Sequence, residues 1–110
     1  MDLRIHAVAV EAVRQLRALL RKIEQHDKDL GRQMRRSATS VPLNIAEGSY
    51  SSKGTRRARY ESALGSAKET LSGLQVAQAW GYVTADECTE VIKRYDHVVG
   101  ALYKLVHARR

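Results

Sequence analysis

The chain of 110 residues contains no phenylalanine, one tryptophan, one proline and one cysteine. Without phenylalanine, the core must be filled by leucine, valine, isoleucine and alanine, which favours helices packed closely on one another. The single cysteine, Cys88, excludes an internal disulfide and gives no sign of secretion. It falls on the apolar side of a predicted helix, so we expect it to be a buried core residue.

Long apolar runs are missing as well. No stretch approaches the roughly 18 residues that a membrane span needs, and Arg4, His6 and Glu11 interrupt any signal-peptide pattern. We therefore expect a cytoplasmic protein without membrane contact. A content of 44% hydrophobic and 28% charged residues is typical of a soluble globular protein, and the length suits one domain over residues 1–110.

Motifs of catalytic chemistry are also lacking. The sequence has no P-loop, no G-x-G-x-x-G and no H-E-x-x-H motif. Its four histidines are scattered, and no E-x-x-H pair provides the ligands of a di-iron bundle. Asp96 and His97 are adjacent, so they point to different sides of a helix. We expect neither catalytic residues nor metal ligands nor a cofactor.

Positive charge is plentiful and unevenly spread. The net charge is +7, and the segment 32–59 alone holds seven cations and one acid, a net +6. Such a concentrated basic patch attracts polyanions, nucleic acid above all. A solvated surface and a dock for an acidic protein are the alternatives. We call these residues the basic cluster: Arg32, Arg35, Arg36, Lys53, Arg56, Arg57 and Arg59.

Apolar residues recur at steps of three and four in four segments, which predicts four amphipathic helices. We expect them over about 5–23, 30–45, 55–79 and 88–105. Their short connections predict antiparallel neighbours. The expected fold is therefore all-α, an up-down-up-down four-helix bundle.

The predicted connections carry recognisable signals. Residues 24–29 form a polar loop in which Asp27 or Asp29 can cap the next helix. Gly48 suits a helix end because it takes positive φ cheaply. The glycines and serines of 48–55 predict a flexible linker.

The third and fourth helices have signals of their own. Gly65 and Gly73 are small enough for a neighbouring helix to approach closely. Gly81 is expected to end the third helix. Thr84 and Glu87 match a capping box, in which a hydroxyl and a carboxylate satisfy free backbone N–H groups at the start of the fourth helix.

The only proline stands in the run RRSATSVPLNIAEG, residues 35–48. Pro42 has no N–H to offer the carbonyl of Ala38, so we expect a kink near residues 38–42 or two short helices. Asn44 and Glu47 are three residues apart and share one face. We expect Pro42, Asn44, Glu47 and Gly48 to be a structural motif.

Asn44 has a donor and an acceptor that suit either the backbone freed at the kink or the third helix. Glu47, the sole acid of the segment, should pair with Arg35, Arg36 or an arginine of the third helix. For Arg35 and Arg36, a binding role and an ion-pair role are equally consistent with the sequence.

For Arg56, Arg57 and Arg59, beside the linker, a binding role is favoured, since free N–H groups at a helix start also receive phosphate. No aromatic residue lies between Arg32 and Gly48. We therefore expect contact with phosphates rather than stacking on bases.

The run 35–48 resembles the signature of the four-helix-bundle proteins known as 23S rRNA intervening-sequence proteins, or S23-type proteins. Two further elements resemble that family, A-x-G-S-x-x-E and the GY that precedes the last helix. The resemblance covers nearly the whole chain, although family members usually carry aromatic residues early in the first and third helices. The matching residues are Arg35, Arg36, Ser40, Pro42, Asn44, Ile45, Ala46, Glu47, Gly48, Ala63, Gly65, Ser66, Glu69, Gly81 and Tyr82.

The resemblance implies an antiparallel four-helix bundle that assembles into a homopentamer. The family includes proteins encoded within inserts of 23S rRNA genes. It is also similar to the accessory variability proteins of diversity-generating retroelements, which work beside a reverse transcriptase and bind nucleic acid. RNA or DNA, other copies of the chain and a reverse transcriptase or other protein are the partners this implies. Self-association is expected for a second reason, because short helices leave little room to bury five aromatic residues in one subunit: Tyr60, Trp80, Tyr82, Tyr95 and Tyr103.

Overall fold

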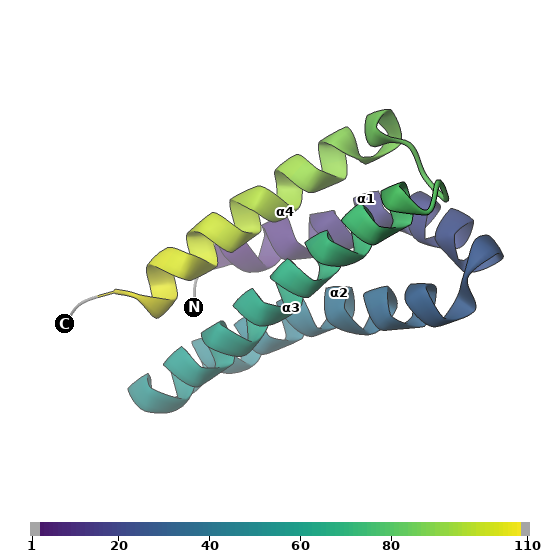
Figure 1. Ribbon diagram of the computed structural model, residues 1–110. Coiled ribbons are helices and arrows are strands. Elements are labelled where there is room, and N and C mark those ends of the chain that lie inside the picture. Colours follow the sequence, from purple (N-terminus) through teal and green to yellow (C-terminus); the bar gives the residue numbers. More distant parts are fainter. Residues whose placement is uncertain (1–2, 109–110) are drawn as a thin grey trace.

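The computed structural model describes residues 3–108, so four terminal residues of the expected domain, 1–2 and 109–110, lie outside the description. The described part folds into four helices (Figure 1). Their bounds are α1 Leu3–His26, α2 Lys28–Ser49, α3 Lys53–Ala79 and α4 Ala85–Val106. The all-α prediction is confirmed.

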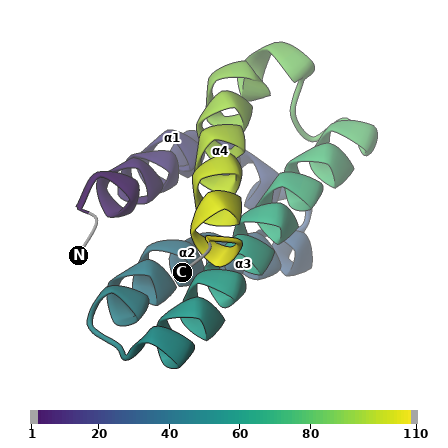
Figure 2. The ribbon, with the colours of Figure 1, turned by 90° about the vertical axis from the view of Figure 1, so that its left-hand side faces the viewer.

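Each helix packs on the one that follows it in the chain, and α4 returns to pack on α1. Figure 2 shows α2 and α3 side by side, with α1 and α4 lying above them. The start of α1 and the end of α4 lie at the same end of the molecule (Figure 1). This is the up-down-up-down bundle that the short connections predicted.

The predicted apolar stripes form the core between the helices. Leu16, Met34, Leu74 and Leu102 come from the four helices in turn and are almost fully buried. Cys88 is buried as expected, and its burial raises the pKa of the thiol. Tyr95 is completely buried and Tyr60 is buried as well, so two of the five aromatic residues do fit inside a single subunit.

Pro42 lies inside α2, and the helix is continuous from Lys28 to Ser49. Two short helices are therefore not formed, and that interpretation was wrong. The proline ring is buried. The kink in α2 that we expect from the missing N–H of Pro42 remains a prediction.

The connection between α1 and α2 is far shorter than the predicted loop, because Asp27 alone separates them. Asp27 has extended backbone, and its carboxylate accepts a hydrogen bond from the N–H of Leu30 at 3.0 Å. This settles the choice between Asp27 and Asp29 as the helix cap. One residue suffices because the cap replaces backbone hydrogen bonds that a longer loop would have supplied.

The predicted linker 48–55 is also mostly helical, since α2 continues to Ser49 and α3 begins at Lys53. The expectation of positive φ at Gly48 was wrong. Within the described residues, only Gly81 adopts positive φ, at 81°, where it ends α3 as predicted. The predicted capping box is present at the start of α4, where Thr84 and Glu87 each bond the other's backbone N–H.

Gly48 instead allows α2 and α3 to approach closely. A Cβ at this position would lie 2.8 Å from Cε1 of Tyr60. A Cβ at Gly73 would lie 2.6 Å from Cγ of Met34, so the predicted close approach at Gly73 is present. Gly65 faces open space instead, and its predicted packing role was wrong.

Hydroxyl groups join the same two helices. Ser37 of α2 and Thr70 of α3 are both buried, and their oxygens lie 2.7 Å apart. One turn further along, the hydroxyl of Ser66 donates to that of Ser40 at 2.9 Å. The buried hydroxyls of Ser37 and Thr70 are thereby satisfied, and these contacts fix the alignment of α2 with α3.

Candidate nucleic-acid interface

The exposed side of α2 forms an open groove of about 540 Å³. Its residues recur every three or four positions along the helix, so they follow one face. Arg59, from the start of α3, closes one end. The lining residues are Arg35, Arg36, Thr39, Ser40, Leu43, Asn44, Glu47 and Arg59. The groove thus contains much of the motif that the sequence singled out.

Glu47 pairs with Arg59, with 3.2 Å between Oε2 and Nη2. This is the pairing with an arginine of the third helix that the sequence allowed. Both side chains are about half exposed, so the pair contributes little to stability. Its position across the groove orients the Arg59 guanidinium toward α2.

Two cations of α2 pair with acids outside the motif. Arg35 donates through Nη2 and Nε to Oε2 of Glu24 in α1, at 2.6 and 3.2 Å. Arg32 lies 3.4 Å from Asp29, one turn earlier in the same helix. Both arginines therefore have neighbouring negative charge to compete with a bound anion.

Arg56 has a role that the sequence did not indicate. Its Nε donates to the carbonyl of Gly48 at 3.3 Å, and Nη2 donates to the carbonyl of Ser51 at 3.2 Å. These carbonyls belong to the end of α2 and to the turn that follows it. The guanidinium thus satisfies groups that a helix end leaves open, and it holds the turn.

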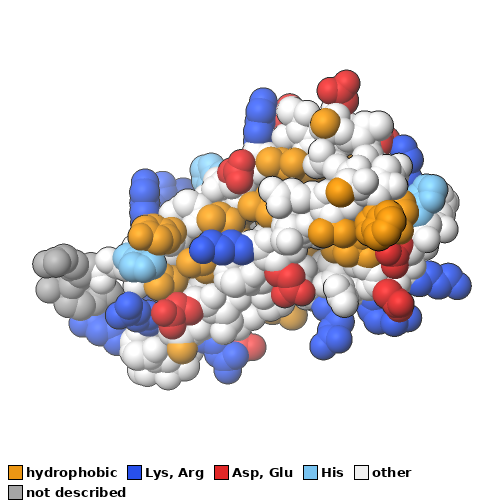
Figure 3. Space-filling model, viewed as in Figure 1, with side chains coloured by type: hydrophobic (Ala, Val, Ile, Leu, Met, Phe, Trp, Pro, Cys, Tyr) orange, Lys and Arg blue, Asp and Glu red, His pale blue; other side chains and the backbone are white. Residues whose placement is uncertain are grey.

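Three cations of the basic cluster remain. Arg36, Lys53 and Arg57 are exposed, and none has an ion-pair or hydrogen-bond partner among residues 3–108. Arg36 lies in the groove, and the other two lie on the first turns of α3. Figure 3 shows Lys and Arg side chains along the side of the molecule that α2 and the start of α3 form. The structure therefore divides the cluster into four engaged and three free cations.

Asn44 forms its hydrogen bonds within α2. Its Nδ2 donates to the carbonyl of Ser40 at 3.0 Å and to the Ser40 hydroxyl at 2.8 Å. The expectation that Asn44 binds backbone freed by Pro42 was wrong, because that backbone group belongs to Ala38. Its link to α3 is indirect, through the hydrogen bond between Ser66 and Ser40.

Leu43 is a groove residue that sequence reasoning missed. It is 58% exposed, with arginines at both ends of the groove around it. The signal was available, because Leu43 stands outside the step-of-four stripe that forms the core side of this helix. An exposed leucine among cations gives the groove an apolar contact point in addition to its charge.

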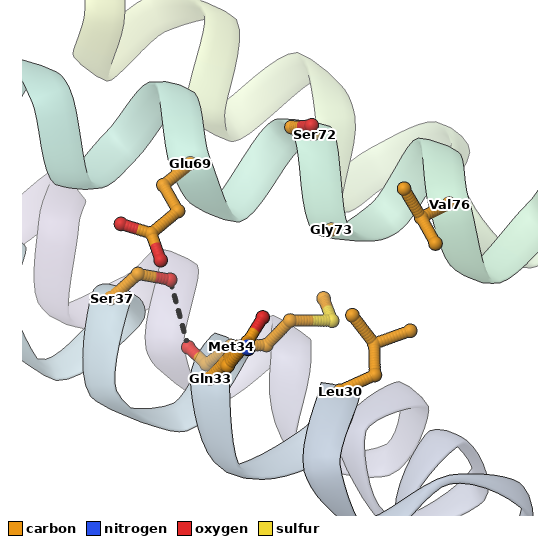
Figure 4. Close-up of a pocket in the computed structure, with 8 residues that line it drawn as sticks. All are labelled: Leu30, Gln33, Met34, Ser37, Glu69, Ser72, Gly73 and Val76. Atoms are coloured by element: carbon orange, nitrogen blue, oxygen red, sulfur yellow. Dashed lines mark hydrogen bonds between the residues drawn. The ribbon is translucent and has the colours of Figure 1, made fainter.

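A second, smaller hollow of about 120 Å³ lies between α2 and α3 nearer the start of α2 (Figure 4). Leu30 and Met34 rise from α2 toward Val76 of α3, and Gly73 leaves room for the Met34 side chain. Polar side chains line its other part. The full lining is Leu30, Gln33, Met34, Ser37, Glu69, Ser72, Gly73 and Val76.

Beside this hollow, at the junctions of α1 with α2 and of α3 with α4, three aromatic rings stack. The rings of His26 and Tyr82 are 5.0 Å apart and 7° from parallel, and those of Trp80 and Tyr82 are 6.4 Å apart and 16° from parallel. Desolvation, and then the neighbouring carboxylate of Asp27, raise the pKa of Tyr82. Sequence reasoning missed this cluster.

Residues 3–108 contain no group of three or more His, Cys, Asp or Glu side chains arranged to hold a metal ion. The described helices also include none that is long and apolar enough to cross a membrane. The groove on α2 is thus built from arginines, hydroxyls, one amide, one carboxylate and an exposed leucine.

Comparison with known proteins supports the resemblance seen in the motif. No curated protein matches the chain. A solved structure does match, that of a protein of unknown function from the S23 ribosomal protein family of Bacteroides thetaiotaomicron VPI-5482. It superposes with a TM-score of 0.82 and 21% sequence identity, over 94% of this chain and 99% of that one. At this identity the likeness concerns the fold.

The sequence model of the 23S rRNA-intervening sequence proteins matches residues 1–104, nearly the entire chain. Those residues include the motif of α2, the start of α3 and the GY before α4. The chain belongs to the family of 23S rRNA-intervening sequence proteins.

Proposed function

We propose that this chain is a non-enzymatic, nucleic-acid-associated protein that acts as a homo-oligomer in the cytoplasm. Arg36, Lys53 and Arg57 are its primary phosphate contacts. The observation behind this proposal is that these three cations are exposed and unpaired, one in the groove of α2 and two on the first turns of α3. A cation already held by a carboxylate gains less from a phosphate than a free one does.

The remaining cluster residues act around these three. Arg35 and Arg59 flank the groove and exchange their carboxylate partners for phosphate when a strand is bound. Arg56 holds the turn that carries Lys53 and Arg57. Phosphate contact of this kind gives affinity without sequence readout.

Self-association is part of the proposal, with five copies as the number that family resemblance implies. Large apolar side chains are exposed outside the aromatic residues near Tyr82, and contact between copies of the chain would cover them. They are Leu43, Tyr50, Val76 and Tyr103. A ring would repeat the cation set and raise avidity for long polyanions. Light scattering at micromolar concentration tests this directly, and a monomeric mass contradicts it.

The biological setting within the family is either an insert of a 23S rRNA gene or a retroelement in which the protein assists a reverse transcriptase. The position of the gene separates these two. Catalysis is not part of the proposal, because Cys88 is buried with a raised pKa and is thus a poor nucleophile.

A second candidate is a scaffold that docks an acidic protein. Leu43 favours it, because an exposed leucine between arginines suits a partner with an apolar residue among acids. Such a partner would be displaced by the substitution Leu43→Ser. Phosphate-driven binding of nucleic acid should be nearly indifferent to that change.

Salt dependence tests the primary proposal. The variant Arg36→Gln/Lys53→Gln/Arg57→Gln removes three free cations and breaks no ion pair or hydrogen bond among residues 3–108. Binding of a fluorescent duplex should weaken, and the slope of log affinity against log salt should become shallower by about 2.7 per subunit. The matched control neutralises three other exposed cations that lack a partner among residues 3–108: Arg17, Lys68 and Lys104.

The control variant carries the same net charge as the test variant, so a general charge effect would weaken both equally. Equal losses would refute the placement of the site. Failure of the parent protein to bind RNA or DNA at low salt would refute the proposed function itself.

A further inference from the structure

The aromatic cluster of His26, Tyr82 and Trp80 lies at the end of the bundle where α2 begins. Among the described residues, ring contacts join Tyr82 to both of the others but do not join those two directly. This is the arrangement of a stack with Tyr82 in the middle. Trp80 then forms one outer layer, and it is 69% exposed.

The stack is held in place by the connections between helices. The hydroxyl of Tyr82 donates to Oδ2 of Asp27 at 3.2 Å, and Asp27 itself is fixed as the cap of α2 through Oδ1. Gly81, with positive φ, turns the chain between Trp80 and Tyr82. A flat surface that is already ordered loses little conformational freedom on binding.

The outer face of Trp80 offers a large planar π-surface to solvent. Nucleobases are flat aromatic ligands that stack on such surfaces, and stacking is tolerant of base identity. A base within a duplex has both faces covered by its neighbours. An open indole therefore selects unpaired bases.

The aromatic stack lies close in the chain to residues of the hollow between α2 and α3, and the hollow is followed along α2 by the groove. Val76 precedes Trp80 by one helical turn and lines the hollow between α2 and α3 (Figure 4). Gln33 lines the same hollow, and Arg36, one turn further along α2, lines the groove. Stack, hollow and groove thus follow one another along α2.

Several charges near the stack are compensated, whereas Glu69 in the hollow has no ion-pair partner among residues 3–108. Lys22 pairs with Glu87 at 2.8 Å and Arg32 with Asp29 at 3.4 Å, while Asp27 accepts from Tyr82. Lys28 is exposed without a partner among residues 3–108. It begins α2 eight residues before Arg36, about 12 Å along a helix. Along α2, Lys28 stands two residues before Leu30, the first residue that lines the hollow, and Arg36 stands one residue before Ser37, the last.

We propose that Trp80 is a stacking platform for an unpaired base, and that the ligand of this surface is single-stranded nucleic acid running along α2. The base rests on the indole, and the adjoining phosphates reach Lys28 and Arg36. This inference rests on the proposed function and deepens it, since it names an unpaired strand and adds a contact that phosphate binding alone does not supply.

The single tryptophan makes the test direct, because fluorescence excited selectively in tryptophan, and not in the five tyrosines, reports Trp80 alone. Three probes of equal length are titrated at low salt: a single-stranded oligothymidine, an abasic strand with the same phosphates, and a duplex. Bound oligothymidine should quench Trp80. The abasic strand and the duplex should bind with little quenching.

Variants measure the contribution to affinity. Trp80→Ala should weaken binding of oligothymidine by about five- to a hundredfold, and leave binding of the duplex and the abasic strand unchanged. Trp80→Phe should lose less, because it keeps a ring. The matched control is Tyr103→Ala, which removes an exposed aromatic that stacks on His107. It should bind as the parent does.

Each contrary outcome has a distinct meaning. If the parent binds oligothymidine without quenching, or if Trp80→Ala binds it as the parent does, the platform is refuted while the proposed function stands. If Trp80→Ala changes the oligomeric mass, Trp80 belongs to a subunit interface and the platform is refuted as well. If the parent binds none of the three probes, the proposed function fails together with the platform.

Discussion

Substitution of Gly48 by alanine tests the close contact between α2 and α3 most sharply. The added Cβ would lie 2.8 and 2.9 Å from Cε1 and Cδ1 of Tyr60, and 3.2 Å from Cβ of Arg59. Two of these contacts are shorter than carbon atoms tolerate. The Tyr60 ring is buried, and its hydroxyl lies 3.4 Å from that of Ser49. A rigid, enclosed ring cannot swing away, so the helices themselves must separate.

Two opposing effects set the size of the change. Alanine in place of glycine within a helix favours folding by about 1 kcal/mol. Overpacking a closely fitted contact costs about 1–3 kcal/mol. Because the buried ring of Tyr60 cannot move aside, we expect the cost at Gly48 to lie near the upper end of this range. We expect a net loss of about 1–2 kcal/mol in the free energy of unfolding, or about 4–8 °C in Tm.

Urea titration followed by circular dichroism measures this loss. Gly65→Ala and Gly100→Ala are matched controls, because a Cβ at either helical position meets nothing within 4 Å. Both should gain up to about 1 kcal/mol. The reasoning is refuted if Gly48→Ala is as stable as the two controls.

Three further predictions concern other contacts. Thr70→Val breaks the buried 2.7 Å hydroxyl contact with Ser37 and should cost about 1 kcal/mol. The double variant with Ser37→Ala should cost less than the sum of the single variants, and strict additivity in a double-mutant cycle would contradict the pairing. A hydrogen bond from Lys22 is the main cause that lowers the pKa of Glu87 from its ordinary 4.5. The stability that Glu87 contributes should thus be complete above that pH and be lost as the pH falls through its lower folded value. Comparison with Glu87→Gln at several pH values measures it, and a difference independent of pH would argue against it. Pro42→Ala should restore a bond to the Ala38 carbonyl, straighten α2 and alter assembly more than helix content. Light scattering and circular dichroism check this, and an unchanged mass would make the proline incidental to assembly.

The helices and the capping box could be predicted because both depend on local spacing. Apolar residues at steps of three and four decide which side of a helix is buried, and the Thr84–Glu87 pair spans a single turn. Gly48 shows where local reasoning fails. Its sequence context suits a helix end, but its actual role depends on a tyrosine of another helix twelve residues later.

The candidate site was predictable in composition but not in arrangement. The basic cluster is visible in the sequence, whereas its division into engaged and free cations follows from partners such as Glu24, which only the packing of α1 brings near Arg35. The stack on Tyr82 depends on two connections meeting at one end of the bundle. The sequence of either connection alone does not indicate that the two lie next to each other in the fold.

The hydroxyl contacts between α2 and α3, together with the close approaches at Gly48 and Gly73, have a consequence for communication across the surface. Sliding one helix by a turn would push larger side chains into the places that both glycines leave open. The cations near Arg59 and the ring of Trp80 are therefore held by a pair of helices that resist sliding relative to each other. Binding at one end of the bundle should therefore not change the conformation of the other end. We expect contacts at the two ends to contribute independently to the free energy of binding.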